Sequence, residues 1–389
     1  MERTGDQSLV KQINKSIVLS SIQKHSPISR IEISKQTGLN KATVSSLVSE
    51  LINEQLTKEV GAGISSGGRK PVMLYFNHTA GYSIGLDLGV NYILGVLTDL
   101  QGNIVQQREF PMANKHYESI YPLLHSLISE LIKAAPKSPF GVVGVGIGVP
   151  GLVDKNGWVL FAPNLGWENV DLKAKLKKDF QIPVVIENEA KAGAYGEKIF
   201  GAGRTSRNLI YVSVGIGVGA GIIIEDKLYQ GNNGFSGEVG HFSIETNGKK
   251  CRCGNIGCWE LYSSEETLLN EVNAAFGKRL TLEEVIQQAE DGNDVILKII
   301  NTVGFYLGVG LVNIVNTFNP EQIVIGNRLA RLENWLHHPI DKVLDQRLLS
   351  YYKKRLDITF SELGPLSSAL GSSAFASNVF LTRDKVSVQ

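Results

Sequence analysis

The sequence contains few cysteines, little net charge and no long apolar run, and each of these absences excludes a class of protein. Only three of the 389 residues are cysteine, and the formal net charge is +1. No run of eighteen apolar residues is present, and the first ten residues lack the apolar core of a signal peptide. An odd number of cysteines is also a poor disulfide framework. With 43% hydrophobic and 20% charged residues, the sequence predicts a cytoplasmic protein of two or three domains with no membrane partner.

The charge that is present is unevenly distributed along the chain. Residues 1–80 contain ten lysines and arginines against six acidic residues, whereas the remainder contains 29 against 32. A basic head on a mildly acidic body favours DNA binding by the head. Many ordinary solvated surfaces are equally basic, so this observation needs support from the motifs.

The N-terminal part of the chain has the periodicity of three short helices. Val10, Ile13 and Ile17 are spaced to share one face of the first helix. Ser29 with Glu32 has the spacing of a capping box, which predicts the start of a second helix.

A third helix follows a turn at Gly38, and Asn40 can cap it. Its apolar residues recur at helical spacing on one face: Val44, Leu47, Val48 and Leu51. Its other face is polar, and the side chains there can reach base edges or phosphates in a major groove: Lys41, Thr43, Ser45 and Ser46.

A glycine-rich loop separates this helix from a stretch with strand periodicity, 72–76. The loop ends in two cations, Arg69 and Lys70, which can contact phosphates or a minor groove. Helices followed by a hairpin with a long tip are typical of a winged helix-turn-helix, and we predict this domain over residues 1–77. The alternative is a small helical dimerisation module. The predicted DNA-binding residues are Asn40, Lys41, Thr43, Ser45, Ser46, Arg69 and Lys70.

The rest of the chain reads as two successive α/β sets, each led by strands and joined by glycine turns. The first set covers residues 78–188 and the second covers residues 189–389. In the second set we predict a strand at 209–214, then a glycine run, then a strand from Gly221 to Glu225. Two such sets predict two lobes with a ligand cleft between them, near the carboxyl ends of the strands.

The three cysteines lie within eight residues of one another. Cys251, Cys253 and Cys258 supply three thiolates, and His241 lies ten residues before the first of them. Three sulfurs and one imidazole form a closed tetrahedral set, which suits structural zinc and leaves no position for a catalytic water. The alternative is three unligated buried cysteines and a surface histidine.

Four segments together resemble the ROK family (repressors, open reading frames and sugar kinases), and the resemblance covers nearly the whole chain. They are Ser29–Leu51 with Gly67–Pro71, Val212–Gly221, Gly237–His241 and the cysteine motif Cys251–Glu260. Within the family, the head and Gly85–Asn91 are most similar to repressors of bacterial xylose operons. The resemblance implies a two-lobed actin-like, RNase H-like sugar-kinase fold, with a C-terminal helix that returns to the first lobe.

The resemblance also implies the residues of a sugar site and the same four zinc ligands. Carried over by motif, the sugar-binding residues are Asn188, Glu189, Glu238, His241 and Glu260. For Glu238 and Glu260 the alternative is an ordinary surface carboxylate, and Asn188 could simply cap the following helix.

Four residues, in three separate parts of the pattern, depart from the family's kinases. Glu189 replaces the catalytic aspartate, Val90 and Asn91 replace a glycine and a threonine of the phosphate turn, and Asn327 replaces a glycine of the adenosine strand. Because phosphoryl transfer depends on positioning and charge neutralisation, these changes argue against catalysis.

We therefore predict a repressor, not an enzyme, that binds a palindromic operator as a homodimer and is released by a sugar, which the resemblance implies to be xylose. Two alternatives remain open. One is an active sugar kinase with a DNA-binding head, and the other is a metal-sensing regulator.

Overall fold

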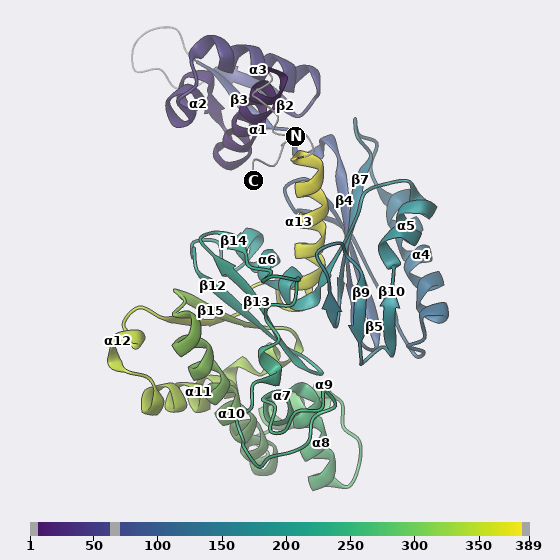
Figure 1. Cartoon of the computed structure of the whole chain (residues 1–389), viewed down its shortest axis with the longest axis vertical. Helices are drawn as coiled ribbons and strands as arrows, with labels where there is room; N and C mark the ends of the chain where they lie inside the picture. The colour runs from purple at the N-terminus through teal and green to yellow at the C-terminus, as the bar shows by residue number, and fades with distance from the viewer. Residues whose placement is uncertain (1–6, 63–70, 383–389) are drawn as a thin grey trace.

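The computed structural model describes residues 7–62 and 71–382 and divides into a head and two lobes (Figure 1). The head combines three helices with a small antiparallel sheet of order β1-β3-β2. Its elements are α1 (Gln7–His25), β1 (Ile28–Ser29), α2 (Arg30–Thr37), α3 (Lys41–Asn53), β2 (Thr57–Ala62) and β3 (Val72–Phe76). This is a winged helix-turn-helix, as the sequence predicts.

The predicted helix caps of the head are confirmed. The Ser29 hydroxyl accepts from Glu32 N while the Glu32 carboxylate accepts from Ser29 N, which completes a capping box. Gly38 ends α2 in the left-handed region at φ 73°, and Asn40 Oδ1 accepts from Thr43 N to start α3.

The predicted apolar face of the first helix is wrong. Val10 and Ile17 are 50% and 42% exposed, whereas Val18, Leu19 and Ile22 enter the core. The reason is that the buried face also carries two short serines, Ser16 and Ser21. Small side chains let α1 approach its neighbours closely, so hydrophobic spacing alone does not identify the buried face.

The two lobes are built on sheets with the same strand pattern. The first has order β11-β7-β4-β5-β6 and the second has order β14-β13-β12-β15-β16. In each, an antiparallel meander is extended by two parallel strands beside its first strand. The repeated pattern agrees with the predicted two-lobed α/β class.

The first sheet is composed of β4 (Tyr82–Leu88), β5 (Tyr92–Asp99), β6 (Ile104–Pro111), β7 (Val142–Val149) and β11 (Val184–Asn188). A short 3-10 helix, η1 (His78–Ala80), joins it to the head, and a small sheet adds β8 (Leu152–Val153), β9 (Val159–Ala162) and β10 (Trp167–Val170). The helices α4 (Tyr117–Ala134) and α5 (Leu172–Phe180) complete this region.

The second sheet is composed of β12 (Leu209–Val214), β13 (Val218–Ile224), β14 (Lys227–Leu228), β15 (Gln322–Gly326) and β16 (Asp357–Phe360). Its helices are α6 (Glu189–Phe200), α7 (Glu260–Ser263), α8 (Glu265–Phe276), α9 (Leu282–Glu290), α10 (Asp294–Phe318), α11 (Glu333–Arg347) and α12 (Ser350–Lys353). Three 3-10 helices are η2 (Val239–His241), η3 (Arg328–Leu332) and η4 (Gly364–Leu366).

One predicted strand boundary in this lobe is corrected. The strand expected from Gly221 begins earlier, at Val218, so Gly219 and Gly221 lie inside β13. A Cβ atom at Gly221 would lie 2.5 Å from the carbonyl oxygen of Ala190, so glycine is required where α6 crosses the strand.

Helix α10 is long and apolar enough to span a membrane by length and composition alone. Just over half of its most apolar stretch is buried inside the protein, however, and Leu307 and Leu311 are fully buried in the core of the second lobe. The structure therefore explains α10 as a core helix.

Helix α13 (Ser367–Leu381) follows the last strand of the second lobe but lies on the sheet of the first (Figure 1). It packs on β4, β5 and β7 and runs alongside α6, which in turn covers β12 and β13. A Cβ atom at Gly371 would overlap the carbonyl oxygen of Ala192, and one at Gly85 would overlap that of Ala369. Glycines thus bring α13 into backbone contact with α6 and with the first sheet.

The far end of α13 belongs to the core of the head. Phe380 is buried in one apolar cluster with Ile22, Leu51 and Val143, and its ring meets that of Phe140 edge-on at 4.9 Å. Head and body therefore share a single core, and α13 connects it to the interior of the two lobes.

We expect Phe380→Ala to lower the free energy of unfolding by about 3–5 kcal/mol, because it leaves a cavity in this shared core. Hydrogen exchange should become faster in α1 and β3 as well as in α13. The matched control is Val379→Ala, which truncates a neighbour that is 42% exposed. Equal stabilities for the two variants would show that Phe380 does not join the head to the body.

Candidate functional site

The exposed face of α3 is the candidate DNA-binding surface. Lys41, Ser45 and Ser46 are exposed and Thr43 is partly exposed, on the side opposite the buried apolar residues of the helix. The side chain of Asn40 is exposed, but its amide oxygen caps the helix at 2.8 Å from Thr43 N. The predicted wing cations Arg69 and Lys70 lie outside the described residues.

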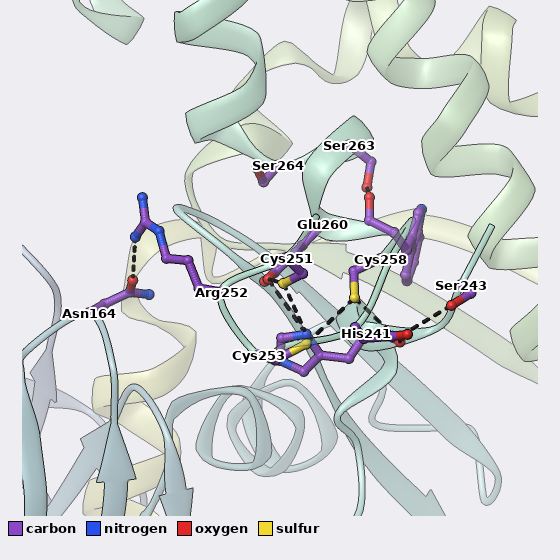
Figure 2. Close-up of polar contacts among 12 residues, drawn as sticks. Asn164, His241, Ser243, Cys251, Arg252, Cys253, Cys258, Glu260, Ser263 and Ser264 are labelled. Carbon is purple, nitrogen blue, oxygen red and sulfur yellow. Dashed lines mark hydrogen bonds and ion pairs between the residues drawn. The ribbon is translucent and has the colours of Figure 1, made fainter. Parts of the chain in front are cut away.

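The predicted metal ligands come together in the second lobe (Figure 2). His241 is the last residue of the short helix η2, and the cysteine loop folds back over it through isolated bridges between Ser243 and Cys258 and between Lys250 and Ile256. One ligand atom from each of the four residues lies within 4.8 Å of every other: His241, Cys251, Cys253 and Cys258.

The dimensions of this cluster fit a tetrahedral metal ion with sulfur ligands. Zinc–sulfur bonds of about 2.3 Å place two sulfurs of a tetrahedron about 3.8 Å apart. Cys253 Sγ and Cys258 Sγ are 3.7 Å apart, and Cys251 Sγ is 3.9 Å from His241 Nδ1. Burial raises the pKa of the Cys251 thiol, so its thiolate form requires a nearby cation. The cluster can therefore hold a metal.

Glu260 lies between the metal cluster and the glycine turn that joins β12 to β13. Its Oε1 lies 3.1 Å from Cys251 Sγ and 3.5 Å from His241 Nδ1 (Figure 2). Its other oxygen faces the glycine turn, where a Cβ atom at Gly217 would lie 3.0 Å away. Two of the predicted sugar residues, His241 and Glu260, are thus adjacent, and any metal in the cluster would influence both.

The remaining predicted acids, Glu189 and Glu238, lie close enough to the buried Asp87 and to each other for their charges to interact. Burial raises the pKa of Glu189 to about 8, with further contributions from the charges of Asp87 and Glu238. Asp87 is itself buried and accepts a hydrogen bond of 2.7 Å from the Tyr92 hydroxyl. At neutral pH Glu189 therefore carries a proton, so it presents a donor where a kinase presents a basic carboxylate.

Asn188 serves as the cap of α6 in this structure. Its Oδ1 accepts from Ala190 N and Lys191 N, and its Nδ2 donates to Gly151 O at 3.0 Å. Both ends of the amide therefore have protein partners, which supports the capping role. A sugar contact by Asn188 stays a prediction.

Side chains of the protein pack closely against the glycine turn of each lobe. The ring of Tyr92 lies against Gly89 and leaves no room for a Cβ atom there, and Asn327 is packed in the same way against Gly215. Asn327 has φ 67°, a conformation that few residues other than glycine adopt, and its Nδ2 donates to Ser213 Oγ at 2.9 Å.

Two residues close to Glu189, namely Tyr92 and Lys191, were not predicted from the sequence as part of the site. Tyr92 directly follows the turn that the sequence already identifies as altered, so its closeness to Asp87 in the chain was a usable signal. Lys191 is a buried lysine two residues after Glu189, and no sequence pattern distinguishes it from a surface lysine of a helix.

A helix-turn-helix head that shares a core with a two-lobed, kinase-like body defines a class of protein, the transcription regulators that respond to a small ligand. Comparisons with known proteins agree. The model of the ROK family matches residues 83–379, and the model of winged helix-turn-helix DNA-binding domains matches residues 15–56. The chain belongs to the ROK family.

Individual relatives cover both the head and the body. The xylose repressor of Bacillus subtilis (strain 168) is 45% identical over 377 residues, which are 97% of this chain and 98% of the relative. A ROK family transcriptional regulator, a homolog of the E. coli MLC protein, aligns with a TM-score of 0.83 at 28% identity, covering 97% of this chain and 99% of that one. A ROK family glucokinase from Streptomyces griseus in complex with glucose and AMPPNP has a TM-score of 0.70 at 28% identity, covering 76% of this chain and 99% of the kinase.

We expect Glu189→Gln to stabilise the protein increasingly as the pH rises. The folded protein holds a proton on Glu189 up to a pKa of about 8, whereas the unfolded chain releases it near 4.5, so wild-type stability falls between these values. Glutamine cannot ionise, so the variant does not lose stability in this way as the pH rises. From about pH 5 to about pH 9 the variant should gain more than about 2 kcal/mol relative to wild type, measured by urea unfolding.

Glu290→Gln, a change of an exposed glutamate on α9, is the control and should show no such trend. A pH-independent difference between Glu189→Gln and wild type would mean that Glu189 is ionised in the folded protein.

Proposed function

We propose that this protein is a cytoplasmic, sugar-responsive transcriptional repressor of xylose utilisation genes, which binds operator DNA and is released by xylose. The observation that carries the proposal is the shared core. Phe380 at the end of α13 is buried together with the head helices, while the same helix packs on α6 beside the candidate sugar residues. A change at the candidate sugar residues can therefore be transmitted to the DNA-binding surface through α13.

Sugar recognition is assigned to the acidic end of the cleft. Sugars present adjacent hydroxyls, each of which can donate and accept a hydrogen bond, and a site with mixed donors and acceptors selects among them. Glu238 and Glu260 serve as acceptors, and protonated Glu189 serves as a donor. His241 contributes the ring nitrogen that does not face the metal cluster, and Asn188 orients the start of α6.

Repression without catalysis is supported by the nucleotide end of the cleft. Tyr92 and Asn327 occupy the space over the two glycine turns, and Glu189 is protonated at neutral pH. A protonated carboxyl cannot remove a proton from a sugar hydroxyl. In addition, the ring form of xylose lacks the exocyclic hydroxymethyl group that sugar kinases phosphorylate at the 6-position.

DNA binding is assigned to the N-terminal end of α3 and the wing. We infer a homodimer on a palindromic operator, because two-fold dimers place two recognition helices in successive major grooves about one helical turn apart. Closure of the lobes on the sugar changes the position of α13, and with it the spacing of the two heads. A mismatch of a few ångströms is enough to weaken binding to both half-sites.

The metal is assigned as structural zinc held by His241, Cys251, Cys253 and Cys258. When bound, zinc supplies a rigid tetrahedral junction and no reactive position. It joins the segment that carries Glu238 to the start of α7, where Glu260 lies. A closed set of four protein ligands exchanges slowly, which argues against metal sensing.

The first test is operator binding at a stated, fixed salt concentration, since phosphate contacts make affinity strongly salt-dependent. Xylose should weaken binding to the palindromic DNA upstream of the xylose genes by about ten- to a hundredfold, whereas other pentoses and hexoses should not. Glu238→Gln should bind the operator normally but lose the response to xylose. Lys41→Ala should weaken binding to all DNA sequences alike.

An operator complex that ignores every sugar would contradict the proposal. Release of ADP from ATP in the presence of xylose, dependent on Glu189, would instead establish a kinase with a DNA-binding head.

A second test concerns the metal. Elemental analysis should find about one zinc ion per chain in wild type, and Cys258→Ser should lose it and melt several degrees lower, because a structural site contributes to folding. Operator affinity of wild type should not follow the free zinc concentration. Affinity that rises and falls with zinc but ignores xylose would favour a metal-sensing regulator.

A further inference from the structure

A buried lysine lies beside the proposed sugar site, and the proposed function assigns it no role. In residues 7–62 and 71–382, Lys191 is the only lysine that is buried, with 3% of its side chain exposed. Removing an ammonium group from water is costly unless its partners compensate for the lost hydration. Its partners therefore show why the position tolerates a charge.

Two contacts attach the lysine to groups on either side of the cleft. Its Nζ donates to Gly234 O in the loop 229–238, and lies 3.8 Å from Glu187 Oε1 at the end of β11. Gln230 reinforces this link, because its Nε2 donates to Glu187 Oε2 at 2.8 Å. The loop is thus tied at two points to the junction of β11 and α6.

The same loop leads directly into Glu238. Gly234 has φ 92° and packs on the backbone of the first lobe, where a Cβ atom would lie 2.9 Å from Val153 O. Three residues later Gly237 O accepts from Ala220 N at 2.8 Å, in the second lobe. The loop therefore spans both lobes, and its contacts determine where the Glu238 carboxylate lies.

Charge complements this geometry. Burial lowers the pKa of Lys191, and the carboxylates of Glu187 and Glu238 act in the opposite direction and favour the ammonium form. Burial raises the pKa of Glu238, an effect that His241 and Lys191 oppose. The lysine thus favours an ionised Glu238 within a cluster of like charges.

We propose that Lys191 is a positioning residue of the sugar site: its ammonium group ties the loop 229–238 to α6 and so holds the Glu238 carboxylate where sugar hydroxyls bind. This inference rests on the proposed sugar-binding function. Removal of the ammonium group frees the loop. Ordering the loop then costs part of the free energy of sugar binding, which weakens the affinity.

The test is calorimetric titration of the full-length protein with xylose, and with the other sugars of the panel. Lys191→Met should weaken binding about ten- to a hundredfold, and Lys191→Arg, which keeps the charge, should recover part of the affinity. The matched control is Lys198→Met on the same helix, where Nζ binds Asp226 Oδ1 at 2.6 Å and Ser206 O at 2.7 Å outside the cleft. This control should bind sugar as wild type does.

Operator affinity without sugar separates positioning from folding. Lys191→Met should still bind the operator, whereas a purely structural lysine would affect operator and sugar binding together. If Lys191→Met does not fold, Gln230→Ala removes the second anchor of the same loop and should weaken sugar binding in the same direction. Unchanged sugar affinity in Lys191→Met would overturn the positioning role of Lys191 but leave the proposed function intact. If Lys191→Met does not fold, unchanged affinity in Gln230→Ala has the same meaning. A wild type that binds no sugar would overturn the proposed function, and this inference with it.

Discussion

The backbone contact between α6 and α13 is the constraint on which the rest of the structure depends. Glycines at Gly371 and Gly85 remove the side chains that would otherwise separate α13 from α6 and from the first sheet. Two serines reinforce the contact, because Ser361 and Ser367 both donate to Glu197 of α6. Two helices packed this closely cannot slide past each other independently.

The cleft shows how a kinase-like site can be adapted to sensing. A catalytic site needs room for two substrates and a base that accepts a proton, whereas a sensor needs only a ligand and a consequence of binding. In this protein the side chains of Tyr92 and Asn327 pack against the two glycine turns. Burial, reinforced by the charges of Asp87 and Glu238, raises the pKa of Glu189 and keeps this side chain protonated at neutral pH. In the proposed function, hydroxyl groups of a sugar donate to the neighbouring carboxylates, an interaction that requires no chemical step.

The sequence predicted those parts of the molecule that depend on local pattern. The caps at Ser29 and Asn40, and the strand at Leu209–Val214, follow from turn chemistry and periodicity within one segment. The metal cluster was also predictable, because its four residues lie close together in the chain.

Features made by contacts between distant segments were not predictable. The buried face of α1 depends on what packs against Ser16, and the role of Lys191 depends on a carbonyl 43 residues away. The sequence of the head does not predict a contact with Phe380. This residue lies more than 300 positions later in the chain and is nevertheless part of the same core. A ribosome makes the head first, yet its core is closed by one of the last helices to be synthesised. An incomplete chain therefore lacks part of the packing that supports α3, so the arrangement couples DNA binding to completion of the sensor.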